Sequence, residues 1–461
     1  MTSNNTNRKK LGNDFTEGNL TKLLITFMLP FLLANLLTNL YNVVDMIIIG
    51  QFVGSAGIVS VTMGGKVMTL CTGIAISLSS GGQVYLSQLT GAKSPLERQN
   101  TVTGTLVSAM FLIALAFSAI GLLFPHVMLG WMNTPGESIA ASAIYMRITC
   151  LGLPMVFVYT TFSAVLRAIG DSTRPLVFVA IAAVTNLVLD ILLVGGLHMG
   201  VAGAAIATVI GQALAFLFSV IYLYRHRDAF VFDFRPRSFR IDRRELWVMM
   251  KIGIPMALQT VLIQGTQLVM ISFINALGLV SAAVYSISTN IVTMSNIVDM
   301  SINSAGGAVV AQNIGAGKYD RARETIFVAL RVTIAFAGLV AIPSMLWPRA
   351  LFGIFSRDEA VLAYAPEIMR ISTFCYFLAA IMGSFNIMTS GTGAAGLGFL
   401  AGILDGVVFR FGFCWLFGMI LNMGVTGYFL GNTLARFGPL IVHSTYFFSG
   451  AWTRRKRLTE A

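Results

Sequence analysis

The feature that most restricts the fold of this chain is a series of long apolar segments between residues 22 and 451, arranged as two copies of one pattern. Four matched stretches recur at an offset close to 224 residues: Met199–Gly203 with Met423–Gly427, Met146–Thr149 with Met369–Ser372, Gln88 with Gln312, and Pro30 with Pro255. So small a drift over a whole half is hard to obtain by chance. We therefore predict an all-α integral membrane protein with twelve transmembrane helices in two pseudo-symmetric six-helix bundles, the architecture of an alternating-access transporter.

The composition agrees with a chain that lies in lipid. Hydrophobic residues make up 56% of the sequence and charged residues only 11%, whereas a soluble domain carries about 25% charged residues. All four cysteines lie in apolar segments without a CxxC pair, so we interpret them as small core residues.

Positive residues account for a net charge of +12, and they gather on one side of the predicted membrane. The richest stretch is the central linker, with seven arginines between Arg225 and Arg244, and the tail carries a basic run at Arg454–Arg457. The alternate loops Gly50–Gly57, Gly195–Gly200 and Asn275–Val280 carry no Lys or Arg. This asymmetry predicts that both termini and the linker lie in the cytoplasm. It is a membrane pattern, and we expect no nucleic-acid partner.

The expected helices cover residues 20–49, 56–91, 97–125, 138–169, 174–195, 200–226, 244–275, 280–316, 321–347, 360–391, 395–420 and 424–451. We accordingly divide the chain into five regions: a disordered cytoplasmic N-terminus (1–19), an N-lobe (20–226), a cytoplasmic linker (227–243), a C-lobe (244–451) and a basic cytoplasmic tail (452–461). Twelve spans suffice for one transport unit, so we expect a monomer.

Two acidic residues lie inside predicted spans of the first half. Asp45 precedes Gly50 by five residues and Asp190 precedes Gly195 by five, so the two carboxylates are expected at similar depth near the outer surface. An Asp inside a span costs several kcal/mol unless it is paired, hydrated or protonated. A neutral residue would serve a merely structural role without that cost, so we favour a functional role for both.

The hairpin that turns near Met199 brings further polar groups to this level. Asp190 lies nine residues before Met199 and Thr208 nine after it. Asn186 and Gln212 lie thirteen residues before and after it. Carboxylate, amide and hydroxyl oxygens suit a hard monovalent cation, and the same group could instead hold a proton on one Asp. The structural alternative is that Asn186, Thr208 and Gln212 are polar contacts between helices.

The second half does not repeat the acidic pair. Phe413 or Cys414 matches Asp190, and Met270 matches Asp45, so we place the cation site in the first half alone. The other charged residues within predicted spans are interpreted as structural, pairing between helices or facing a cavity: Lys66, Arg147, Asp299, Asp405 and Arg410.

With these motifs the chain resembles the multidrug and toxic compound extrusion (MATE) family of secondary antiporters over nearly its whole length. The stretches that carry the resemblance are Tyr41–Asp45, Gln88–Ala92 with its copy Gln312–Ala316, and Leu166–Asp171 followed by Arg174-Pro175. The resemblance implies a first-lobe site for sodium or a proton at Asp45, Asn186, Asp190 and Thr208. Tyr145, Ser163 and Gln212 are expected to support it, with Ser163 where the family often places an amide. Helices 7 and 10 lack the acids that another branch carries there.

The preferred hypothesis is an efflux antiporter of a bacterial cytoplasmic membrane. It exports amphipathic, mostly cationic compounds in exchange for protons or sodium ions, with no further cofactor. The substrate-contact residues are not identified by the sequence. The alternative is a lipid-linked oligosaccharide flippase of the same broad superfamily, which the few central cations disfavour. No HExxH, GxSxG or Walker motif occurs, so we expect neither an enzyme nor an ATP-driven pump; a channel is less expected because the buried acids favour alternating access.

Overall fold

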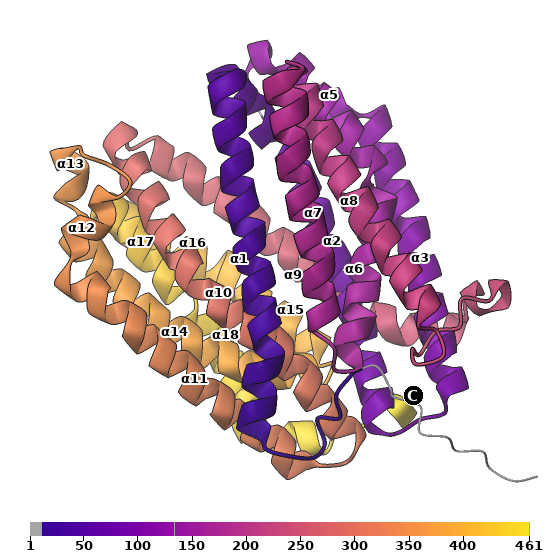
Figure 1. Ribbon diagram of the computed structural model, residues 1–461. Coiled ribbons are helices and arrows are strands. Elements are labelled where there is room, and N and C mark those ends of the chain that lie inside the picture. Colours follow the sequence, from indigo (N-terminus) through magenta and orange to yellow (C-terminus); the bar gives the residue numbers. More distant parts are fainter. Residues whose placement is uncertain (1–11, 133, 461) are drawn as a thin grey trace, which may run out of the picture. The chain divides into compact units, whose positions relative to one another are not determined.

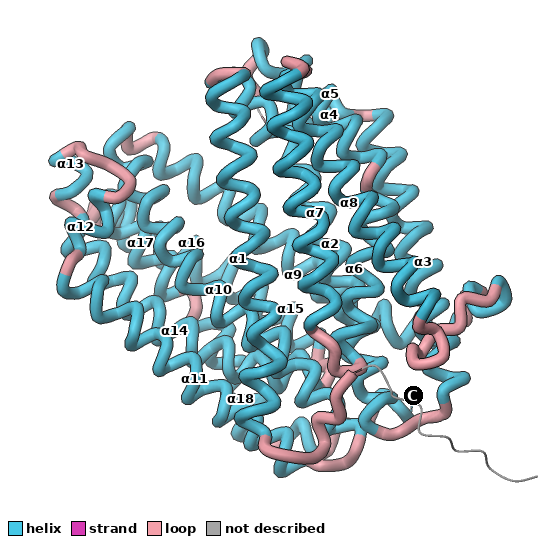
Figure 2. The backbone as a smooth tube through the Cα atoms, in the orientation of Figure 1, coloured by secondary structure: helices cyan, strands magenta, loops and turns pink. Residues whose placement is uncertain are grey.

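The computed structural model describes residues 12–132 and 134–460, and all regular elements in these ranges are helical (Figures 1 and 2). Nine helices of the described ranges are long and apolar enough to cross a membrane, or ten if the bent pair α5 and α6 counts as one span. The segments α10 and α17–α18 complete the predicted twelve. The first is 37 residues long but rich in Ser, Thr and Asn, and the second is broken into two short helices.

The first half contains six helical segments. They are α1 (Leu20–Phe52), α2 (Ser55–Gly91), α3 (Leu96–Leu123), the pair α5 (Gly136–Leu151) and α6 (Leu153–Ala168), α7 (Thr173–Asp190) continued by the π-helix η1 (Ile191–Gly196), and α8 (Gly200–Arg225). A short helix, α4 (Pro125–Trp131), precedes the fourth segment. The fourth segment bends by 49° at Gly152, just before Pro154, because proline cannot donate the backbone hydrogen bond that would continue the helix.

The second half repeats this order. Its segments are α9 (Arg243–Asn275), α10 (Leu279–Gly315), α11 (Tyr319–Leu346), α14 (Ala365–Gly391), the broken helix α15 (Ala395–Ile403), η3 (Leu404–Phe409), α16 (Arg410–Cys414) and η4 (Trp415–Ile420), and the pair α17 (Gly424–Leu434) and α18 (Phe437–Phe448). Two short helices, α12 (Pro348–Gly353) and α13 (Glu359–Leu362), lie between α11 and α14.

The repeat extends to details of the backbone. The π-helices η1 and η4 occupy residues 191–196 and 415–420, so they are related by the same offset of 224. The turns after them match as well, because His198 and Asn422 both adopt a left-handed conformation, with φ of 52° and 53°. Met199 N donates to Leu193 O at 2.9 Å, and Met423 N donates to Phe417 O at 3.0 Å. The two halves are therefore copies of one structure and not merely of one hydropathy pattern.

The chain forms two compact units. Among the described residues, unit 1 contains residues 12–14 and Pro30–Gly253, and unit 2 contains Phe15–Leu29 and residues 254–460. The boundaries differ from those drawn on the sequence because they fall inside two helices. The first ten residues of α1 belong to unit 2 and its remainder to unit 1, whereas α9 begins in unit 1 and passes to unit 2 next to Pro255.

The segment before α1 is ordered where we expected disorder. Residues 1–11 lie outside the described part of the chain, but residues 12–19 make specific contacts. In unit 1, the Asn13 side-chain amide donates to Gly170 O at 3.1 Å. In unit 2, Phe15 is fully buried and its backbone N–H donates to Gln312 Oε1 at 3.2 Å. Arg321 Nε donates to Phe15 O at 2.9 Å. The buried Phe15 ring and the hydrogen bonds to the backbone N–H and C=O of Phe15 fix the position of a segment that is otherwise polar.

The linker packs on α3 within unit 1. Ser108 Oγ donates to Phe239 O at 2.7 Å, and Asn100 Nδ2 donates to Ser238 Oγ at 3.2 Å; both acceptors belong to the 3₁₀-helix η2 (Pro236–Phe239). Gly104 makes this approach possible, since a Cβ at that position would lie 1.7 Å from the Ser238 carbonyl oxygen. The linker is thus a docked part of unit 1.

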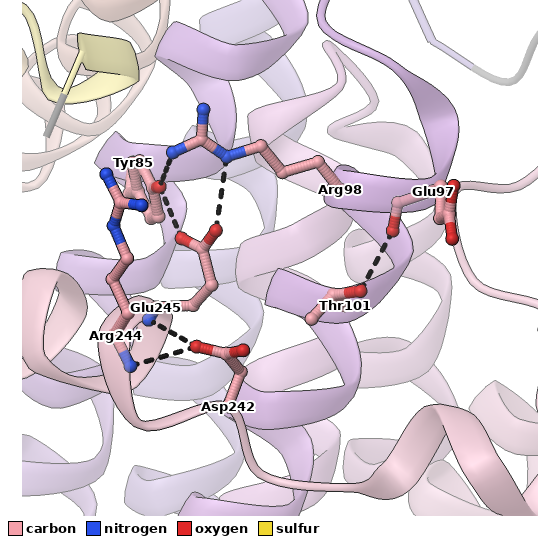
Figure 3. A network of polar contacts seen from close by, with 7 residues as sticks. All are labelled: Tyr85, Glu97, Arg98, Thr101, Asp242, Arg244 and Glu245. Carbon is pink, nitrogen blue, oxygen red and sulfur yellow. Dashed lines mark hydrogen bonds and ion pairs between the residues drawn. The ribbon is translucent and has the colours of Figure 1, made fainter.

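A polar network holds the start of α9 (Figure 3). The Asp242 carboxylate accepts from the backbone N–H groups of Arg244 and Glu245 at 2.9 and 3.0 Å, which caps the helix. Glu245 accepts from the Tyr85 hydroxyl and from Arg98 Nε, the latter at 3.1 Å. Arg98 also donates to the Tyr85 hydroxyl at 2.8 Å. These contacts tie α9 to α2 and α3.

Replacement of Arg98 by Ala should lower the free energy of unfolding by about 2 kcal/mol, the scale of hydrogen bonds to a charged partner. The loss leaves the Glu245 carboxylate, whose side chain is only 11% exposed, without its counter-ion. Thermal unfolding of the purified protein in detergent measures the change. Arg235→Ala is the matched control, because Arg235 is 81% exposed and lies 3.7 Å from Asp233, and it should change stability by less than about 0.5 kcal/mol. Equal effects of the two substitutions would contradict a structural role for the network.

Candidate functional site

The two predicted carboxylates meet in unit 1. Asp190 is the last residue of α7, immediately before the π-helix η1, and it is fully buried. Asp45 lies on α1 and is half-buried. The carboxyl groups of the two residues are close enough for a hydrogen bond between them when one carries a proton. The sequence prediction that both acids reach one level of the bundle is therefore matched by their contact in the structure.

The polar partners come from the hairpin of α7 and α8, in a register that differs from the predicted one. Asn186 Nδ2 donates to Thr208 Oγ1 at 3.4 Å, so these two residues lie level with each other. We expected Asn186 opposite Gln212 and Asp190 opposite Thr208. The observed pair is centred on residue 197 and not on Met199, because residues 191–196 form a π-helix, whose rise per residue is smaller than that of an α-helix.

Thr208 presents an oxygen to the cluster. Its hydroxyl donates to Ala204 O at 3.0 Å within α8, which leaves the oxygen lone pairs for an acceptor role. Tyr145 on α5 lies next to Thr208 and close to both Asp45 and Asp190. We call Asp45, Tyr145, Asn186, Asp190 and Thr208 the carboxyl cluster.

Two predicted supporting residues are not joined to the carboxyl cluster by a hydrogen bond. Ser163 Oγ on α6 and Gln212 Oε1 on α8 are both buried and have no hydrogen-bond partner within the described part of the chain. Gln212 lies one turn beyond Thr208 on the same helix. Because Thr208 and not Gln212 lies level with Asn186, Gln212 is one turn farther from the hairpin turn than this pair.

Sequence reasoning missed Tyr41 as a member of the site. Tyr41 lies one turn before Asp45 on α1, and it is close to Asp45, Tyr145 and Tyr159. Its spacing of four residues from Asp45 was the available signal, because residues i and i+4 share one face of a helix.

The carboxyl cluster is short of hydrogen-bond donors. Asp45 Oδ1 and both carboxylate oxygens of Asp190 are buried and receive no hydrogen bond from another described residue. Buried polar atoms are normally satisfied, and two ionised carboxylates in contact repel each other. A proton or a monovalent metal ion between the two carboxyl groups would give their oxygens a partner and would remove the repulsion between the two negative charges. The donor set of carboxylate, hydroxyl and amide oxygens fits a hard cation.

A family model described as MatE matches residues 30–192 of the chain and, separately, residues 255–416. The chain belongs to the MatE family. The two matches begin at Pro30 and Pro255, which are the first pair of the internal repeat, so the family pattern occurs once in each half. The protein is thus a MATE family transporter and, as its composition predicts, a multi-pass membrane protein.

Curated relatives of this MatE protein span most of its length. It is 27% identical over 375 residues to the probable multidrug resistance protein YoeA of Bacillus subtilis, which covers 80% of each chain. It is 26% identical over 395 residues to the multidrug export protein MepA of Staphylococcus haemolyticus, which covers 86% of each chain.

Solved structures share the fold. One, described as the outward-facing conformation of a multidrug resistance MATE family transporter of the MOP superfamily, superimposes with a TM-score of 0.89 at 19% identity and covers 96% of this chain and 99% of that one. A MOP superfamily transporter from Pyrococcus furiosus gives a TM-score of 0.88 at 18% identity over 96% and 98% of the two chains. At this identity the likeness concerns the fold alone.

Proposed function

We propose that this protein is a multidrug efflux antiporter that exports amphipathic, mostly cationic compounds in exchange for protons or sodium ions by alternating access. The observation that carries the proposal is the pair of facing carboxyl groups of Asp45 and Asp190, whose buried oxygens lack donors. The names of the relatives YoeA and MepA, a multidrug resistance protein and a multidrug export protein, support the substrate class.

The carboxyl cluster would couple ion entry to conformation through charge. When the cluster holds a cation, Asp45 on α1 and Asp190 on α7 are both attracted to it, and the two helices are held together at this level. When the cation leaves, the carboxylates repel each other and the helices are free to separate. A bound ion shifts the balance between two conformations only by its different affinity for each, and this pair supplies such a difference.

Sodium and the proton make different demands on the neutral oxygens of the cluster. A sodium ion needs several oxygen ligands, so Thr208 and Asn186 would belong to its coordination shell. A proton on one carboxyl needs only the second carboxylate as acceptor. If transport requires the neutral oxygens of Thr208 and Asn186, the coupling ion is sodium; if it does not, the coupling ion is the proton.

Dye efflux from proteoliposomes tests the proposal. The purified protein would be reconstituted with a fluorescent cationic dye, and efflux measured under an inward sodium gradient alone and then under an inward proton gradient alone. We expect one of the two gradients to accelerate efflux over the rate without a gradient. Equal rates in all three conditions would overturn antiport.

Thr208→Val separates the two coupling ions, because valine keeps the shape of threonine and removes the oxygen. If sodium is the coupling ion, the sodium concentration for half-maximal efflux should rise about tenfold, which corresponds to about 1.4 kcal/mol for one lost ligand. Proton-driven efflux should be unchanged. Thr69→Val on α2 is the control, since Thr69 is exposed and its hydroxyl donates only to Gly65 O. An equal effect of both substitutions would remove Thr208 from the site.

A further inference from the structure

Unit 2 contains a buried ion pair on the broken helix between α15 and η4. Arg410 Nη2 donates to both carboxylate oxygens of Asp405, at 2.9 and 3.0 Å, and Nη1 donates to Asn432 Oδ1 at 2.7 Å. The side chains of Arg410 and Asp405 are 6% and 13% exposed. The guanidinium Nε is buried and has no acceptor among the described residues.

The pair lies at the place that the repeat assigns to the carboxyl cluster. The offset of 224 that relates η1 to η4 also relates Asn186 to Arg410 and Thr208 to Asn432. Both pairs are hydrogen-bonded across their hairpins, Asn186 to Thr208 and Arg410 to Asn432. The guanidinium therefore replaces the amide of unit 1 and reaches the same neighbour on the opposite helix.

Within the described residues of unit 2, no carboxyl pair lies at this level. The same offset matches Asp190 to Cys414, and the sequence repeat matches Asp45 to Met270. Cys414 and Met270 both belong to one buried apolar cluster, which also contains Tyr285 and Phe429. The Asp405 carboxylate and the Asn432 amide contact Arg410, and the Cys414 thiol and the Tyr285 hydroxyl from α10 lie near it.

The π-helix η3 brings Asp405 to Arg410. The offset is 223 at the left-handed residues Gly170 and Gly393 and 224 at η1 and η4, so unit 2 has one residue inserted between these points. One inserted residue is what converts a turn of α-helix into a π-helix, and η3 lies in that interval. The wider turn aligns residues i and i+5, which are Asp405 and Arg410. The corresponding helix of unit 1, α7, is continuous over Thr173–Asp190.

We propose that Arg410 is a tethered cation that permanently holds, in unit 2, the place where unit 1 binds its exchangeable cation. The inference rests on the proposed function of the carboxyl cluster. Asp405 is the resident counter-ion, and Asn432 takes the part of Thr208. The ion pair with Asp405 and the hydrogen bond to Asn432 hold η3, α16 and α17 together throughout transport, and ion coupling belongs to unit 1 alone. Arg410 is therefore a positioning residue for unit 2 and contributes no ion of its own to the exchange.

The test removes the tethered charge in a protein whose exchangeable site is already disabled. The thermal unfolding midpoint of the purified protein is measured against sodium, with choline replacing it at constant ionic strength, and against pH. Asp190→Asn should lose the cation response of the wild type. Asp190→Asn with Arg410→Gln should regain a response of a few degrees, because Asp405 is then a buried carboxylate without a partner. Adding Asp405→Asn should abolish it again.

These outcomes separate the two proposals. A wild-type protein that responds to neither cation, or an Asp190→Asn protein that keeps the full response, would sink the role of the carboxyl cluster. The second result concerns the tethered cation. If the wild type responds to a cation, Asp190→Asn does not, and the double variant Asp190→Asn with Arg410→Gln gains no response, the proposal for Arg410 is overturned and the role of the carboxyl cluster stands. Arg410→Lys keeps a tethered charge, so in the Asp190→Asn background it should gain no response, and a gain would also overturn the inference.

A chemical complement covers the case in which Arg410→Gln does not fold. Arg410→Ala removes the guanidinium group, and free guanidinium ion at millimolar concentration should raise its unfolding midpoint or its purified yield. Urea, the neutral molecule of similar shape, should not. Wild-type protein should respond to neither at this concentration. Equal effects of guanidinium and urea on Arg410→Ala, or no effect of either, would mean that the position does not require a charge.

Discussion

Asp190→Asn is expected to abolish gradient-driven dye efflux while leaving the protein folded in the membrane. The substitution removes a negative charge from a fully buried site and keeps its shape. Loss of one partner from a buried charge interaction costs about 3 to 5 kcal/mol, so cation affinity should fall at least 100-fold. Efflux measured under the effective gradient should drop to the rate without a gradient.

Two measurements keep this result interpretable. With choline in place of sodium and at alkaline pH, where the carboxyl cluster holds no cation, the unfolding midpoint of Asp190→Asn should be no lower than that of the wild type, since the substitution removes carboxylate repulsion and breaks no hydrogen bond. Asp228→Asn is the control for loss of one negative charge, because Asp228 is exposed beyond the end of α8. Efflux by Asp190→Asn at the wild-type rate would refute the assignment of the coupling site.

Gly104→Ala is expected to cause a large loss of stability. The added Cβ would lie 1.7 Å from the Ser238 carbonyl oxygen and 3.0 Å from the Phe232 ring, so the linker must leave α3. Overpacking against backbone costs about 3 kcal/mol, and the hydrogen bonds from Ser108 and Asn100 would be lost with it. Thermal unfolding in detergent would measure the change.

Gly338→Ala is the matched control for this substitution. Gly338 lies inside α11, and no atom lies within 4 Å of the position that its Cβ would take. Replacement of an unstrained helical glycine by alanine stabilises a protein by about 0.4 to 1 kcal/mol. A similar loss in both variants would mean that glycine content, and not the docked linker, sets the stability.

Much of the fold could be predicted because the sequence contains two copies of one pattern. Apolar segments locate the helices, and matched residues such as Met199 and Met423 locate the same turn in both halves. The π-helices were not predicted, since they change the rise of a helix without a distinctive residue pattern. That omission placed the centre of the α7–α8 hairpin two residues too late and paired Asp190, and not Asn186, with Thr208.

Part of the candidate site could be predicted from the sequence for an electrostatic reason. A charged side chain in an apolar span is conspicuous, so Asp45 and Asp190 could be found without a structure. Tyr41 is less conspicuous, because a tyrosine in a membrane helix needs no special explanation. Asp405 and Arg410 were expected to pair with other helices or to face a cavity. Their spacing of five residues does not share a face in an α-helix, and only the π-helix η3 brings them together.

The exchange of helix ends between the units bears on how such a chain arose. Each half donates the first turns of its leading helix to the other unit: residues 20–29 join unit 2, and residues 243–253 join unit 1. A half-length ancestor with this architecture would have been a swapped homodimer, in which two identical subunits lent each other these turns. Separately expressed halves should accordingly be unstable alone and recover when they are produced together.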